Sequence, residues 1–252
     1  MNVDVDNDGK KDLVFGNEKL GQMAWYAPVV KAKKVTWKRT AISEPNAKGV
    51  GLFSHGLGFG DINGDGRKDV MIRGGWWEAP ADLKASPWKW HEADLGESCA
   101  QMITYDFDSD GDADVVSSSA HEYGVWWYEQ KFDSNKNSYF VTHTIDSTFS
   151  ESHSLVLEDV NRDGLPDLIT GKRFFSHQGS GPGGLEPAVL YWFELLKDGQ
   201  QRPVWVKHLI DDTSGVGIQF VSDDMNKDGM LDIIIGNKNG VFLFEQLAPK
   251  NH

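Results

Sequence analysis

The chain has little cysteine, no long apolar run and no concentration of basic residues. Its single cysteine, Cys99, excludes an internal disulfide, and we interpret it as a small core residue rather than a thiol nucleophile. No apolar stretch approaches the ~20 residues that a membrane-spanning helix needs. No segment repeats apolar residues at helical spacing. Lysine and arginine form no stripe that would suit nucleic acid. We therefore expect a helix-poor protein without a membrane span or a nucleic-acid partner.

Five short acidic loops dominate what is present. Each has the form Asp-x-Asp/Asn-x-Asp-Gly-x-x-Asp, so side-chain oxygens recur at positions 1, 3, 5 and 9, with glycine at position 6. Oxygen ligands around a sharp turn suit a hard cation of calcium's size, and we predict up to five structural Ca²⁺ ions. The predicted ligands are Asp4, Asp6, Asp8 and Asp12; Asp61, Asn63, Asp65 and Asp69; Asp106, Asp108, Asp110 and Asp114; Asp159, Asn161, Asp163 and Asp167; and Asp224, Asn226, Asp228 and Asp232.

These loops differ from EF-hands, which share the opening but need a bidentate Glu at position 12 and flanking helices. Position 12 holds no carboxylate here, being Phe15, Ile72, Ser117, Thr170 and Ile235. Each loop instead runs into a β-branched or aliphatic stretch that is typical of a buried strand. A metal-free Asp-Gly hairpin would explain one copy but not the recurring pattern. Because many of the acids lie in the loops, we attribute much of the formal charge of −13 to metal ligation.

The loops recur at a spacing that predicts a β-propeller. Successive first aspartates are 57, 45, 53 and 65 residues apart, which is close to the length of a propeller blade. Each period offers four strand-like segments, so we predict an all-β propeller of four-stranded antiparallel blades. The ten Trp and thirteen Phe residues supply packing between blades. The predicted single domain, 1–252, divides into units of about 1–45, 46–95, 96–146, 147–212 and 213–252.

The first and last units look incomplete. Only Met1-Asn2-Val3 precedes the first loop, so we expect its inner strand to be missing, and the last unit ends near Phe242 without a fourth strand. We therefore expect a fragment of a larger propeller of about seven blades, with a secretory signal upstream. A compact ring of five blades with frayed ends is the alternative.

The loops, together with Gly58-Phe-Gly-Asp61, resemble FG-GAP/VCBS repeats, found in integrin α-subunit propellers and in many secreted bacterial proteins. The resemblance implies a calcium-stabilised propeller that is secreted, periplasmic or on the cell surface. Three further segments, 74–80, 120–124 and 171–173 followed by His177, look like a bacterial subgroup of stand-alone VCBS propellers. Members of that wider group resemble the propeller domain of aldos-2-ulose dehydratase, which eliminates water from a keto-sugar.

The histidines fall into two sets. His91, His143 and His208 occupy matching places in the fourth strands and are interpreted as structural. His55 and His153 lie six residues before the first aspartate of their loops, whereas His121, Lys172, Arg173 and His177 lie five to ten residues after a closing aspartate. Because each loop joins strand one to strand two at one face, both groups should reach the opposite face. We predict that His55, His121, His153, Lys172, Arg173 and His177 form a pocket at the central channel mouth, near Glu122 and Tyr123.

This pocket has two chemical interpretations. Neutral imidazoles could hold Zn²⁺ or Mn²⁺ that polarises a sugar carbonyl. Alternatively, His153 or His121 acts as a metal-free base while Lys172 and Arg173 stabilise an enolate. The sharpest hypothesis is a lyase or dehydratase acting on a keto-sugar. The competing class is a non-catalytic propeller that binds a glycan or a protein partner, and a polar rim that holds only water is a third interpretation.

Two further features have weaker interpretations. The Gly-rich segment 179–184 lacks the Lys-Ser/Thr and the helix of a phosphate loop, so we interpret it as a flexible insertion, such as a lid over the pocket. The pairs Trp76-Trp77 and Trp126-Trp127 could stack on sugars, but we expect each to split, with one ring packed between blades and one exposed.

Overall fold

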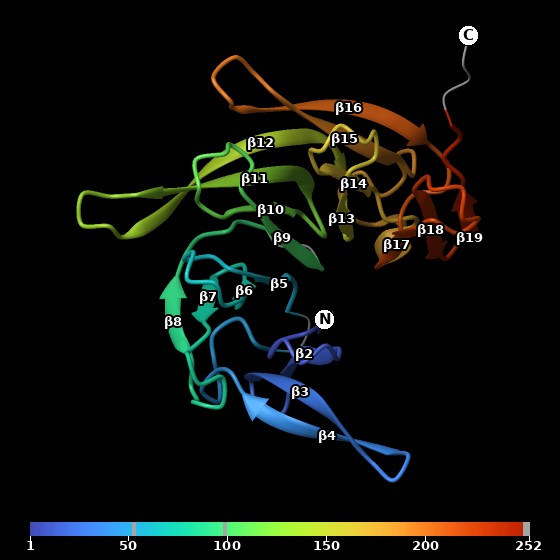
Figure 1. The fold of residues 1–252 in the computed structure, drawn as a ribbon. Coiled ribbons are helices and arrows are strands. Elements are labelled where there is room, and N and C mark those ends of the chain that lie inside the picture. The colour runs from blue at the N-terminus through green and yellow to red at the C-terminus, as the bar shows by residue number, and fades with distance from the viewer. Residues whose placement is uncertain (52–53, 98–99, 249–252) are drawn as a thin grey trace.

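The regular structure of the protein is almost entirely β, arranged in the described residues as five antiparallel blades that follow one another around an arc (Figure 1). The computed structural model describes residues 1–51, 54–97 and 100–248, so Cys99 lies outside the described residues. Within these ranges the one helix is a short 3-10 turn, Ser176–Gly179. No helix of the described chain is long and apolar enough to cross a membrane.

Each sheet is a blade whose strands follow the sequence order from the centre outward. The strands are β1 (Asn2–Val3), β2 (Asp12–Asn17), β3 (Gln22–Lys31) and β4 (Lys34–Ala41) in the first blade; β5 (Leu57–Gly60), β6 (Asp69–Ile72), β7 (Gly75–Glu78) and β8 (Lys89–Glu92) in the second; β9 (Gln101–Tyr105), β10 (Asp114–Ser118), β11 (Tyr123–Phe132) and β12 (Ser138–Ser150) in the third; β13 (Leu155–Glu158), β14 (Asp167–Gly171), β15 (Leu190–Lys197) and β16 (Pro203–Asp211) in the fourth; and β17 (Phe220–Asp223), β18 (Asp232–Asn237) and β19 (Gly240–Phe244) in the fifth. This arrangement confirms the predicted all-β propeller architecture.

The two end blades differ from each other. The expectation that the first blade lacks its inner strand is wrong, because β1 pairs with β2 through Asn2 with Leu13 and Val3 with Asp12. Two residues are enough for this strand because the acidic loop begins directly after them. The fifth blade has the order β17-β18-β19 in the described residues, as predicted from the absence of a fourth strand-like segment.

The core lies between blades because adjacent residues of a strand face opposite sides. In β6, Val70 packs toward the first blade and Met71 toward the third. The same alternation places Trp77 in the first interface and Trp76 in the second, each only 3% exposed. The expectation that one ring of this pair is exposed is therefore wrong, since a blade with neighbours on both sides buries both faces. Trp126 and Trp127 also pack into different interfaces.

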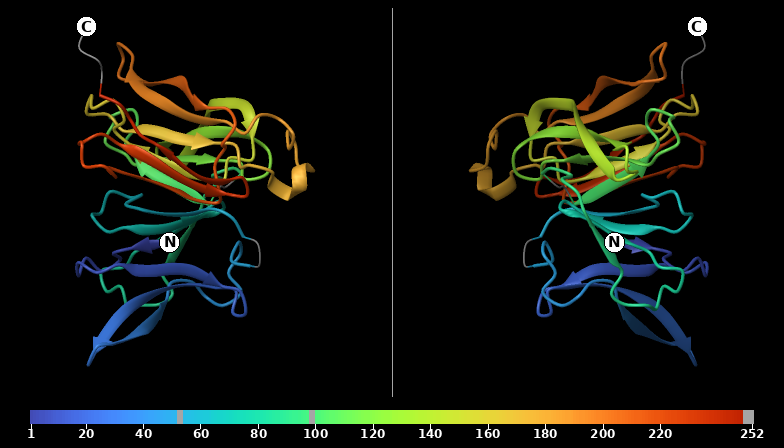
Figure 2. Two further views of the ribbon diagram at one scale, coloured as in Figure 1. Left: turned by 90° about the vertical axis from the view of Figure 1, so that its right-hand side faces the viewer. Right: turned by 90° about the vertical axis from the view of Figure 1, so that its left-hand side faces the viewer.

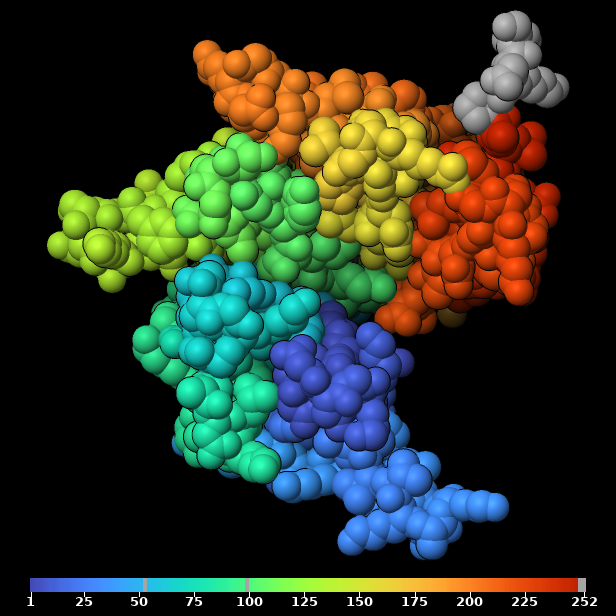
Figure 3. Space-filling model, viewed as in Figure 1, coloured from blue at the N-terminus to red at the C-terminus, as the bar shows by residue number. Residues whose placement is uncertain are grey.

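The second and third blades make an unusually close contact. Their inner strands, β5 and β9, pair in parallel, which joins the two blades into one eight-stranded sheet. Glycine makes this approach possible, because a Cβ at Gly60 would overlap the side chain of Thr104. The first blade (blue) and the last (red) flank the open side of the arc (Figure 3).

Candidate functional site

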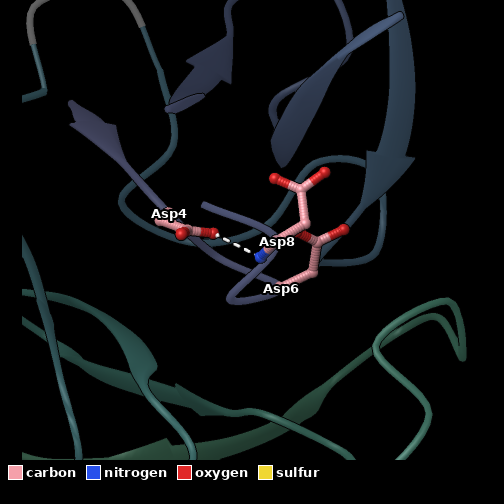
Figure 4. A group of neighbouring side chains, drawn as sticks. All are labelled: Asp4, Asp6 and Asp8. Carbon is pink, nitrogen blue, oxygen red and sulfur yellow. Dashed lines mark hydrogen bonds between the residues drawn. The ribbon is translucent and has the colours of Figure 1, made fainter. Parts of the chain in front are cut away.

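The acidic loops share one backbone geometry. In the first loop one carboxylate oxygen of Asp4 accepts the N–H of Asp8 at 3.1 Å (Figure 4). The other oxygen accepts the N–H of Gly9 at 2.9 Å. The first aspartates of the other four loops accept the equivalent pair of N–H groups. Glycine at position 6 has φ near +81° in the first loop, in the region that other residues adopt at a cost. The loop is therefore folded around its first aspartate.

The closing aspartate of each loop is buried, and in four of the five loops it accepts an N–H from the third strand or from the residues just after that strand. In the second blade, Oδ2 of Asp69 accepts the N–H of Ile62 at 3.0 Å, and Oδ1 accepts that of Ala79 at 2.8 Å. Burial raises the pKa of Asp69 and of Asp114 to about 7 and that of Asp167 to about 6. Asp12 differs in that its buried Oδ1 has no hydrogen-bond donor.

Two loops already bring three carboxylate oxygens within 4.8 Å of one another: those of Asp4, Asp6 and Asp8, and those of Asp106, Asp108 and Asp114. The other three loops carry Asn at position 3, and its Nδ2 donates to the position-5 carboxylate at 3.0 Å. The donor chemistry of these loops suits a hard cation.

A lysine ammonium lies among the carboxylates of the third loop. The Nζ atom of Lys131 is 3.4 Å from Asp108, 3.2 Å from Asp110 and 2.6 Å from Glu129. This group shows that the loop attracts a positive charge in the fold as it stands.

The histidines of the fourth strands have a structural role. His91, His143 and His208 each contact the last carboxylate of the third strand, with distances of 2.7, 2.8 and 2.9 Å to Glu78, Glu129 and Glu194. Each imidazole also stacks on a tryptophan, Trp76, Trp127 or Trp192, with ring centroids 4.1 to 4.4 Å apart. This repeated Trp-His-Glu contact ties strands three and four together.

The four remaining histidines of the described chain gather into one cluster, although they come from three blades. Nε2 of His121 is 3.1 Å from Nε2 of His55, and Nδ1 of His121 is 3.0 Å from Nε2 of His177. The ring of His153 lies 5.1 Å from that of His55. His55 and His153 precede β5 and β13, and His121 follows β10, so the cluster lies at the strand ends opposite the acidic loops.

The cluster favours neutral imidazoles. Burial lowers the pKa of His153 to about 4, and the N–H of its Nδ1 faces the carbonyl oxygen of Ile218 at 3.2 Å. Burial, together with the neighbouring histidines and Arg173, also lowers the pKa of His55 and of His121. A neutral His121 satisfies both of its contacts by donating from one ring nitrogen and accepting at the other. Rings linked in this way can relay a proton between His177 and His55.

The charge of Arg173 acts on the histidines of the cluster, whereas the charge of Lys172 is paired with a carboxylate. Burial lowers the pKa of Arg173, and its Nη2 donates to Oγ of Ser176. The Lys172 side chain is buried, with Nζ 2.8 Å from Oε2 of Glu151. The ammonium of Lys172 is thus paired with a buried carboxylate, and the predicted role of Lys172 in the pocket stays a prediction.

Glu151 is the main residue that sequence reasoning missed. It is fully buried, holds a left-handed backbone with φ +55°, and its Oε1 has no hydrogen-bond partner. Its charge acts on His121 and on Arg173. The available signal was its position two residues before His153, where a charged side chain interrupts the approach to an inner strand.

The Gly-rich segment 179–184 lies against this region and follows directly on the short helix Ser176–Gly179, which carries His177. This short helix stands out from the blades (Figure 2). A Cβ at Gly181 would overlap Oε1 of Glu151, and the hydroxyl of Tyr123 donates to Glu186 at 2.7 Å. His177 has φ +47°, a conformation that non-glycine residues rarely adopt and that often accompanies functional sites.

A surface hollow of about 590 Å³ adjoins the cluster through Arg173 and Ile218. Because Ile218 supplies the carbonyl oxygen that His153 contacts, the hollow and the histidines share a wall.

Comparison with protein-family models gives one match. The model described as an FG-GAP-like repeat matches residues 4–72 and 106–170, which together make up more than half of the chain. The chain belongs to the FG-GAP-like repeat family. In this FG-GAP-repeat protein, each matched segment begins at the first aspartate of an acidic loop and ends at position 12 of the next loop. No curated protein matches the chain.

Proposed function

We propose that this FG-GAP-repeat protein catalyses an elimination next to the carbonyl of a keto-sugar, with the histidine cluster as its acid–base group. The observation that carries the proposal is the continuous contact from His177 through His121 to His55, with distances of 3.0 and 3.1 Å. Imidazoles with lowered pKa are unprotonated near neutral pH and accept a proton from carbon. The sequence resemblance to a dehydratase propeller points the same way.

The proposed step is a redox-neutral loss of water. His153 or His121 removes the proton from the carbon beside the carbonyl, and Arg173 stabilises the enolate oxygen that develops. The electron pair of the broken C–H bond then forms a C=C bond while the neighbouring C–O bond breaks. The departing hydroxyl takes a proton from an imidazolium of the cluster and leaves as water. The proton taken from carbon thus leaves in the water molecule, and proton transfer between the linked rings leaves the imidazoles as neutral as they began.

We favour the metal-free form of this chemistry over the Zn²⁺ or Mn²⁺ form. His121 presents its two ring nitrogens to two different neighbours, so one ion cannot engage His55, His121 and His177 in this arrangement. Nδ1 of His153 is likewise committed to a backbone carbonyl. Turnover that survives a strong chelator would support this choice, whereas turnover restored only by Zn²⁺ or Mn²⁺ would reverse it.

The test is a screen of keto-sugars for an ultraviolet-absorbing enone product, with sugar binding measured in parallel by calorimetry. His121→Asn and His153→Asn should each lower turnover by at least about a hundredfold, the usual contribution of a general base. His208→Asn is the matched control, because this histidine lies in a Trp-His-Glu contact outside the cluster. Binding without product, weakened by the same two variants, would instead identify a glycan-binding module.

We also propose that the acidic loops bind Ca²⁺ as a structural ion. The support is the oxygen-only donor set and the approach of three carboxylates within 4.8 Å in two loops. Extracellular calcium modules bind Ca²⁺ at ~0.1–1 mM, so sites of that affinity would be filled in the secreted, periplasmic or cell-surface location that the sequence resemblance implies. Melting that is insensitive to both Ca²⁺ and chelator would contradict this proposal.

A further inference from the structure

The hollow beside the histidine cluster is lined by basic side chains and by no carboxylate. It has a volume of about 590 Å³, and its lining includes Arg173, Lys238, Ile218, Gln219 and Asn237 but no Asp or Glu. The whole chain has 38 acidic residues and a formal charge of −13, so a basic hollow is unusual on its surface. The volume falls within the ~300–1,000 Å³ of typical small-molecule sites.

Neither cation is neutralised by an ion pair within the described chain. Arg173 donates to Oγ of Ser176, and Nζ of Lys238 donates to the backbone oxygen of Phe175 at 3.0 Å. Both partners are uncharged. Glu151 does act on Arg173, but its own charge is compensated by Lys172 at 2.8 Å. Two positive charges at one hollow therefore lack a counter-ion, and an anionic ligand would supply it.

We propose that the hollow binds an acidic sugar, with the sugar carboxylate held between Arg173 and Lys238. This inference rests on the proposed carbohydrate function and names the substrate class for the same site. The planar guanidinium of Arg173 suits a carboxylate, and its five N–H donors allow it to hold this group as well as the enolate oxygen, while Lys238 adds a flexible point charge. Gln219 offers an amide to the sugar hydroxyls. Since Ile218 contacts both the hollow and His153, a sugar anchored at this end extends its carbon chain toward the imidazoles.

Equilibrium binding tests the inference without requiring turnover. Calorimetry would compare glucuronate and galacturonate with glucose and galactose, each at low and at raised salt concentration. The acidic sugars should bind at least about tenfold more tightly, a difference of about 1.4 kcal/mol, because their carboxylate forms hydrogen bonds with two charged groups. Lys238→Gln should remove about this factor for the acids and leave the neutral sugars unchanged. Lys19→Gln, at another exposed lysine, is the matched control.

The outcomes separate this inference from the proposed function. Equal affinity for acidic and neutral sugars, no detectable binding of the acids, or no effect of Lys238→Gln would each overturn it. Tighter binding of glucose 6-sulfate than of the uronates would assign the hollow to a sulfate ester and overturn the carboxylate form. Charge-dependent binding of uronates with no product from any sugar would support the acidic-sugar site and refute the proposed elimination reaction. Because Lys238 is exposed, its substitution should leave the unfolding curve unchanged.

Discussion

Relative to Asp12, Pro28 occupies the position from which the other four blades supply an N–H donor to the closing aspartate. In those four blades the residue after the closing aspartate pairs with a residue of strand three, and the N–H donor lies two places beyond that partner. The acceptors are Oδ1 of Asp69, Asp114, Asp167 and Asp232, and the donors are Ala79, Gln130, Leu195 and Gln246. In the first blade, Leu13 pairs with Tyr26, so the equivalent residue is Pro28. Proline has no N–H, which explains why Oδ1 of Asp12 is buried without a partner.

Replacing Pro28 should therefore stabilise the protein. Pro28→Ala restores a donor to a buried carboxylate, worth ~1.5–3 kcal/mol, and loses ~0.4–1 kcal/mol of unfolded-state restriction. We expect the free energy of unfolding in urea to rise by about 1 kcal/mol. In an Asp12→Asn background the gain should shrink, because the bond is no longer charge-assisted. An equal gain in both backgrounds would mean that Asp12 is not the acceptor.

The buried His153 predicts a loss of stability in acid. Its pKa is lowered from 6.5 to about 4, so the unfolded chain binds the proton more tightly than the folded one. With respect to this group, the free energy of unfolding has its full value above pH 6.5 and falls as the pH drops toward 4. The loss is up to about 3 kcal/mol for a residue that is 6% exposed.

The aspartates with raised pKa have the opposite effect, because their protonation in the folded state stabilises the protein as the pH falls. The contribution of His153 is therefore measured as the difference between the native protein and a variant that lacks this histidine. Urea unfolding of the native protein and of His153→Asn, followed from pH 7.5 to 4.5, should show a steeper acid loss in the native protein. Parallel curves would show that His153 is not buried as a neutral imidazole.

Lys131 should compete with Ca²⁺ for the third acidic loop. Its ammonium lies 3.2 Å from Asp110 and 3.4 Å from Asp108, where a bound cation would meet like charge. Lys131→Gln should lower the Ca²⁺ concentration needed for thermal stabilisation by about tenfold, and should destabilise the metal-free protein by leaving the carboxylates uncompensated. Differential scanning calorimetry across a Ca²⁺ series measures both effects. Lys89→Gln, which removes a lysine paired with Glu78 outside the loops, should leave the Ca²⁺ dependence unchanged.

The close pairing of β5 with β9 should make Gly60 intolerant of a side chain. A Cβ there would overlap Thr104, so Gly60→Ala is expected to cost about 1–3 kcal/mol of unfolding free energy. Gly74→Ala is the matched control, because nothing lies within 4 Å of its added Cβ. Thr104→Ala in the Gly60→Ala protein should recover part of the loss. If both alanine variants unfold alike in urea, the two inner strands are not in close contact.

The fold and the turn structure of the acidic loops could be predicted from local patterns in the sequence. A loop needs only nine consecutive residues to set its turn, and the run after it shows strand character without distant contacts, so both are visible in the sequence. The spacing of the loops then indicated the blades, and the FG-GAP-like match agrees with it. The clustering of His55, His121, His153 and His177 at one end of the blades was also predictable, because the direction of each strand follows from the order of strands and loops in the chain.

Other features depend on which blades meet and at what distance. Lys172 looked like a pocket cation, but its side chain is paired with Glu151, which lies 21 residues earlier. Trp76 and Trp77 are both buried because blades cover both faces of the sheet. The missing donor at Pro28 depends on the register in which β2 pairs with β3. The basic hollow of Arg173 and Lys238 forms where the fourth blade meets the fifth. Local periodicity encodes strands and turns, whereas burial, ion-pair choice and cavity shape are decided by the long-range packing of blades.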